Sequence, residues 1–104
     1  MAVHRKHDGE IGAAAALFRV RDEAAAIALS NDTNFGLGAS VWTADVALGQ
    51  RLAQQLEAGT VAINGLVQSD PRVPFGGTKD SGYGKELSAY GMKEFSNLKT
   101  VMVY

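Results

Sequence analysis

The chain has 104 residues, of which 46% are apolar and 20% are charged, and it contains no cysteine. This length allows one domain at most, with a small core. A formal net charge of −1 argues against nucleic-acid binding, and no apolar run approaches the roughly 20 residues of a membrane span. Because no secretory signal pattern is evident, the cytoplasm is the expected location.

The first half of the chain begins with a polar stretch and then predicts a strand and a helix. Residues 1–12 lack any hydrophobic period and are interpreted as a mobile arm. The apolar residues within 17–20 predict a buried strand. Asp22 is a candidate N-cap for an alanine-rich helix that stops near Asn31.

A second strand and a second helix follow. Residues 39–43 read as a strand, with Thr43 and Asp45 as candidate caps of the next helix. Leucines recur every fourth residue over 48–56, which indicates an amphipathic helix. Gly59 is expected to end this helix in a left-handed conformation.

The order of elements predicts an α/β fold. A third strand over 60–64 completes a small parallel βαβαβ sheet with flanking helices, one face of which needs cover from elsewhere. Phe18 and Trp42 are expected in its core. A glycine-rich loop over 76–84 implies close backbone packing. A short helix then carries apolar residues on one face, and the chain closes on a β-prone terminal strand; that face comprises Leu87, Tyr90, Gly91 and Phe95.

Three kinds of chemistry find little support. The loop is not expected to bind phosphate, because Tyr83 stands where a P-loop needs lysine. No metal site is expected, since His4 and His7 lack a third ligand nearby. The carboxylates show no pairing that would suit acid–base catalysis, so no catalytic residue is assigned.

The segment from Ser69 to Phe75 offers the best candidates for ligand contact. Ser69 and Arg72 place a hydroxyl and a guanidinium close together, which suits a carboxylate. An equally good interpretation is a capped turn in which Asp70 neutralises Arg72. Phe75 lies in a loop, where aromatic residues often line pockets.

Several motifs in order closely resemble the carboxy-terminal segment of aldehyde dehydrogenases: ALSNDTNFGLGASVWT, AGTVAING, VPFGGTKDSGYGK and KELSAYGMKEF. NGLVQSDPRVPFGG is most similar to bacterial succinate-semialdehyde dehydrogenases. The resemblance implies that Phe75 lines a substrate tunnel and Ser69 contacts the substrate carboxylate; Arg72 is added on charge. It also implies a catalytic-domain portion over about 13–95 and an oligomerisation strand over about 98–104.

In that family NAD or NADP is the cofactor, and the catalytic thiol, the general-base glutamate, the oxyanion asparagine and the Rossmann domain lie upstream of this segment. The chain alone is therefore expected to bind no cofactor. Glu10 matches the family's ribose-binding glutamate only after a one-residue slip.

These features lead to one main hypothesis and two alternatives. The main hypothesis is a truncated aldehyde dehydrogenase, inactive alone, that forms a homo-oligomer or associates with full-length homologues. A free-standing oligomerisation or interaction module from the same family is the first alternative. An independent nucleotide-binding domain is the second.

Overall fold

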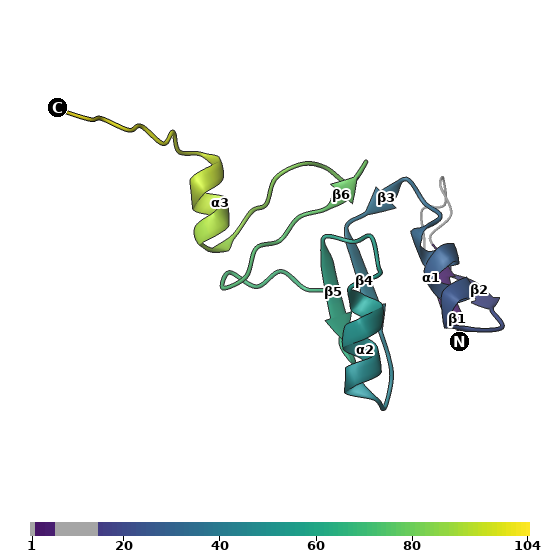
Figure 1. Cartoon of the computed structure of the whole chain (residues 1–104). Helices are drawn as coiled ribbons and strands as arrows, with labels where there is room; N and C mark the ends of the chain where they lie inside the picture. The colour runs from purple at the N-terminus through teal and green to yellow at the C-terminus, as the bar shows by residue number, and fades with distance from the viewer. Residues whose placement is uncertain (1, 6–14) are drawn as a thin grey trace.

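The computed structural model describes residues 2–5 and 15–104, which form short α-helices and short β-strands (Figure 1). The α/β class is therefore confirmed. The elements in chain order are β1 (Ala2–Arg5), β2 (Ala16–Arg19), α1 (Glu23–Asn31), β3 (Phe35–Gly36), β4 (Gly38–Val41), α2 (Val46–Ala53), β5 (Thr60–Ile63), β6 (Thr78–Lys79) and α3 (Ser88–Glu94).

The best-formed unit is β4–α2–β5. The two strands are parallel, and their register runs from Gly38 opposite Thr60 to Val41 opposite Ile63. α2 packs on one face of this pair, where Gly49 lets the helix approach closely: a Cβ there would lie 2.9 Å from a methyl carbon of Ile63. This half of the predicted strand–helix alternation is confirmed.

The complete βαβαβ arrangement is wrong for this structure. β2 does not join β4 and β5; it pairs antiparallel with β1, and the described strands form three separate two-stranded sheets. The short strand β3 pairs antiparallel with β6 and joins neither of the other two sheets. Alternating helix and strand signals cannot reveal such competing partners, because strand pairing depends on distant segments.

The predicted mobile arm, residues 1–12, falls mostly on residues 1 and 6–12, outside the described part of the chain. Within it, Ala2–Arg5 forms β1, a strand that the sequence did not indicate. The division into portions 13–95 and 98–104 remains a prediction.

Local capping signals predicted the helix starts correctly. The Asp22 carboxylate accepts a hydrogen bond from the backbone N–H of Ala25 at 2.8 Å, and Asp45 accepts one from Leu48 at 3.0 Å. The predicted end of α2 is wrong, because the helix stops at Ala53 and Gly59 has no positive φ. Gly59 instead lies against the carbonyl oxygen of Gly76, where no side chain would fit.

The hydrophobic core is small. The buried apolar residues of the described chain are Ala26, Val41 and Leu52. Accessible surface totals 8263 Å², whereas a compact protein of this mass exposes about 5,600 Å². Burial of Phe18 and Trp42 was predicted wrongly, since they are 37% and 65% exposed. Much apolar surface therefore lacks a cover within the chain.

The carboxy-terminal part stands away from the other elements (Figure 1). α3 contacts the loop before it through Gly91, where a Cβ would lie 2.7 Å from the carbonyl carbon of Glu86. Tyr90 and Phe95 are exposed, so only part of the predicted apolar face packs here. Residues 97–104 continue without a strand, so the predicted terminal strand has no ladder partner among the described residues.

Candidate functional site

Phe75 lies at the base of the glycine-rich loop. Its backbone N–H donates to the carbonyl of Glu86 at 2.9 Å, and the N–H of Glu86 donates back to Phe75 at 2.8 Å. This reciprocal pair closes the loop formed by residues 76–85. The half-buried Phe75 is thereby fixed at the point where the predicted ligand-contact segment, Ser69 to Phe75, ends and the loop begins.

The glycines of this loop are required by close contacts. A Cβ on Gly76 would lie 2.6 Å from the carbonyl oxygen of Gly84, and one on Gly77 would lie 2.5 Å from the Cβ of Ser81. Gly82 and Gly84 have φ values of 120° and 69°, which disfavour other residues. The tight packing predicted for the loop is present.

Two lysines, which the sequence reasoning missed, hold this loop in place. The Nζ of Lys85 donates to the carbonyls of Gly76 and Gly77 at 2.9 and 3.0 Å. A lysine within a glycine-rich loop is a usable signal for such contacts, because loop carbonyls often lack ladder partners.

Lys79 joins the loop to two other segments. Its Nζ donates to the carbonyls of Asn31 and Thr33 at 2.8 and 3.1 Å and forms an ion pair with Glu57. The Asn31 side-chain oxygen accepts from the backbone N–H of Glu57 at 2.9 Å. The end of α1, the segment before β5 and the loop are thus linked through one ammonium group.

Replacement of Lys79 by methionine is expected to lower the free energy of unfolding by about 2 kcal/mol, because the carbonyls at the end of α1 lose a charged donor. Lys99→Met removes the same charge from the extended terminus and is expected to change stability by less than about 0.5 kcal/mol. Urea unfolding of both variants measures the difference. Equal midpoints would contradict the role assigned to Lys79.

A hollow of about 490 Å³ lies over the same loop and is lined by residues between Gly77 and Lys85. Its two ammonium groups, those of Lys79 and Lys85, already donate to backbone carbonyls. Both ammonium groups at the hollow are therefore engaged with the chain's own backbone.

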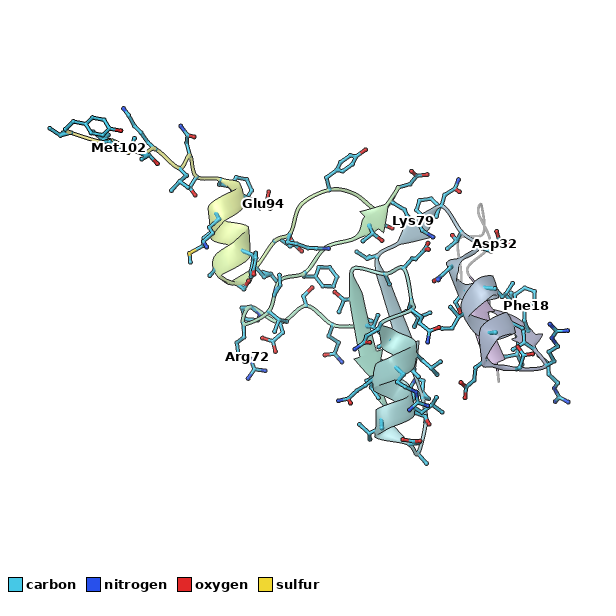
Figure 2. All side chains as sticks on the ribbon, viewed as in Figure 1. Phe18, Asp32, Arg72, Lys79, Glu94 and Met102 are labelled. Carbon is cyan, nitrogen blue, oxygen red and sulfur yellow. The ribbon has the colours of Figure 1, made fainter. Side chains whose placement is uncertain are left out.

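Arg72 is paired within its own turn. Its Nε donates to the Asp70 carboxylate at 2.9 Å and its Nη2 donates at 2.5 Å, while the N–H of Val73 donates to the Asp70 carbonyl at 3.1 Å. The Arg72 side chain projects away from the fold (Figure 2). Of the two interpretations of this segment, the structure contains the capped turn with Asp70 neutralising Arg72.

The pairing has a consequence for titration. The Arg72 side-chain hydrogen bond, followed by its backbone N–H, lowers the pKa of Asp70 from its ordinary value. A lowered folded-state pKa contributes stability above the ordinary carboxyl pKa, and this contribution is lost as pH falls through the lowered value. We expect Asp70 to titrate below the ordinary aspartate pKa in carboxyl ¹³C NMR, and Arg72→Ala to raise its midpoint. An unchanged midpoint in Arg72→Ala would contradict the pairing.

The other predicted contact residues occupy the same connection. Ser69 is exposed at its start and Phe75 lies at its end. The N–H of Ser88 donates to the Pro71 carbonyl at 3.1 Å, which holds the turn against the start of α3. Glu10 lies outside the described residues.

Two general features are absent from the described part of the chain. No group of three or more histidine, aspartate or glutamate side chains there could hold a metal ion. No helix there is long and apolar enough to cross a membrane.

Known proteins similar to this chain share one family. The sequence model of the Aldehyde dehydrogenase family matches residues 10–101. An aldehyde dehydrogenase of Paenarthrobacter nicotinovorans is 59% identical over 86% of the chain and 20% of that protein. Succinate-semialdehyde dehydrogenase [NADP(+)] 1 of Mycobacterium ulcerans is 49% identical over 88% of the chain and 20% of that protein.

Solved structures give the same result. The Mycobacterium tuberculosis aldehyde dehydrogenase complexed with NAD⁺ has a TM-score of 0.78 at 42% identity, over 82% of this chain and 17% of that one. Succinic semialdehyde dehydrogenase from Streptococcus pyogenes, complexed with NADP⁺, also has a TM-score of 0.78, at 38% identity over 81% of this chain and 18% of that one. The chain spans about a fifth of the length of its curated relatives. It belongs to the aldehyde dehydrogenase family.

Proposed function

We propose that this chain is the carboxy-terminal part of an NAD(P)-dependent aldehyde dehydrogenase that oxidises succinate semialdehyde, and that it is inactive alone. The proposed substrate rests on the 49% identity, over 88% of the chain, with a relative named succinate-semialdehyde dehydrogenase. The absence of cysteine supports the second part, because the family's reaction uses a thiol nucleophile.

Three residues of one connection would handle the substrate. Phe75, fixed by its backbone bonds to Glu86, lines the path of the aldehyde. Ser69 donates its hydroxyl to the distal carboxylate. Asp70 takes the Nε and Nη2 edge of Arg72, so a substrate carboxylate would use the remaining Nη1 edge of the guanidinium.

The cofactor would be held elsewhere. NAD or NADP accepts the hydride in this family, and we propose that residues outside the glycine-rich loop hold it, since both ammonium groups of that loop already donate to backbone carbonyls. Glu10 is the one candidate for a ribose contact from this chain.

Association is part of the proposal. The terminal residues 98–104 are exposed and apolar for much of their length, with Val103 at 93%. A run of this kind can add to a sheet edge of another subunit. We propose a homo-oligomer or a complex with full-length homologues, located in the cytoplasm.

Complementation tests the function. The pure chain is mixed with the remaining four-fifths of the Mycobacterium ulcerans relative, and NADPH formation is followed with succinate semialdehyde. Turnover is expected from the mixture and from neither component alone. A mixture without turnover, despite a demonstrated complex, would contradict the proposal, and so would turnover by the pure chain.

The carboxylate contact is tested in the same mixture. Ser69→Ala is expected to raise KM for succinate semialdehyde about tenfold, because one hydrogen bond to a charged group is lost. KM for butanal, which lacks the distal carboxylate, should not change. Equal effects on both aldehydes would remove Ser69 from the carboxylate site.

A further inference from the structure

The first strand of the chain lies outside the family match, which begins at residue 10. β1 nevertheless pairs with β2 along its whole length, from Ala2 opposite Arg19 to Arg5 opposite Ala16. α1 lies against β1 (Figure 1). A segment outside the family match is thus paired with a family-matched element.

β2 depends on β1 for its ladder. It pairs with no other strand in the described structure, and Leu17 remains 79% exposed. A short strand with apolar side chains and an unpaired edge readily adds a strand from another molecule. β1 fills one of the two edges of β2.

We propose that β1 is an intramolecular edge strand that prevents this edge of β2 from pairing with the β2 of a second copy. A second β2 fits the same place, because two copies related by a two-fold axis pair their strands antiparallel, as β1 and β2 do. Both strands also have four residues.

The sequence of β2 suits this pairing. In the centred antiparallel register, Leu17 faces Phe18 of the second copy and Ala16 faces Arg19. The central pairs are apolar, and no like charges stand directly opposite each other, which favours association. The two-fold pairing therefore meets no electrostatic obstacle within the strand.

Amide hydrogen exchange by NMR tests the proposal. In an antiparallel ladder alternate residues face opposite edges, so two alternate amides among residues 16–19 face β1. In the intact chain these two should exchange about fivefold more slowly than the other two, at every protein concentration. Amides of β5 report whether each variant keeps its fold.

A chain lacking residues 2–5 is the main variant. The same two amides should lose protection in dilute solution and regain it as concentration rises and dimers form. Val3→Pro and His4→Pro are a matched pair, because only one of these adjacent N–H groups faces β2. Only one of the two substitutions should reproduce the loss.

Two results would overturn the proposal. The first is equal protection of the β1-facing amides in the intact and shortened chains at low concentration. The second is protection that never returns in the shortened chain at high concentration while β5 remains protected. If β5 protection is lost in the shortened chain, the two proline variants decide the question. Equal loss of protection at the β1-facing amides in both variants overturns the proposal. Loss of that protection in only one variant supports it.

Discussion

Gly59→Ala is expected to lower the free energy of unfolding by about 3 kcal/mol or more, enough to remove the folded state of a chain with so small a core. The new Cβ would overlap the carbonyl oxygen of Gly76. Neither backbone can yield easily, because the N–H of Gly59 donates to Gly36 at 2.9 Å and the Gly76 carbonyl accepts from Lys85.

Gly65→Ala is the matched control. The nearest atom to a Cβ at Gly65 is the carbonyl oxygen of Ile63 at 3.9 Å, an ordinary contact, and Gly65 has no positive φ. The free energy of unfolding of the Gly65→Ala variant should change by less than about 1 kcal/mol. Urea unfolding followed by circular dichroism measures both variants. Similar midpoints for the two would show that Gly59 and Gly76 do not meet as described.

The second large effect concerns activity. The isolated chain is expected to oxidise succinate semialdehyde more slowly than an intact relative by at least a factor on the order of a million, the loss that follows removal of a catalytic nucleophile alone. It contains no cysteine that could form a thioester.

NADPH absorbance during a long incubation with the aldehyde measures this activity. The rate with the chain should equal the rate in buffer. The same preparation mixed with the complementing fragment serves as the positive control. Aldehyde-dependent NADPH formation by the chain alone, resistant to repeated purification, would contradict the account.

Features set by neighbouring residues were predictable from the sequence. Asp22 and Asp45 cap helices because each carboxylate reaches a backbone N–H three residues ahead. The glycine-rich loop was also interpreted correctly as a place of close approach, since glycine at this density destabilises a regular helix or strand and permits tight backbone contact. The pairing of β4 with β5 followed from a strand–helix–strand order with short connections.

Features set by distant contacts were not predictable. Trp42 is a large aromatic residue in an apolar run, which is typical of a core position, yet its side chain is mostly exposed in the described chain. The role of Gly59 depends on Gly76, which is far along the sequence and whose position the local pattern does not define. β1 carries no strand signal and is formed by its pairing with β2.

The candidate site shows the same division. Phe75 was identifiable as a loop aromatic, but its reciprocal bonds with Glu86 were not. Arg72 and Asp70 were weighed as partners because they are two residues apart, and the structure pairs them. Lys79 was missed because its acceptor carbonyls belong to α1 and the segment that follows it.

Size-exclusion chromatography with light scattering tests whether the uncovered apolar surface of this chain is a docking surface. With a radius of gyration of 17.2 Å, against about 13 Å for a compact domain of this length, the chain has much surface to cover. Association into a dimer or a larger species, which grows with concentration, is expected. A monomer at every concentration, with no binding of an apolar dye, would contradict it.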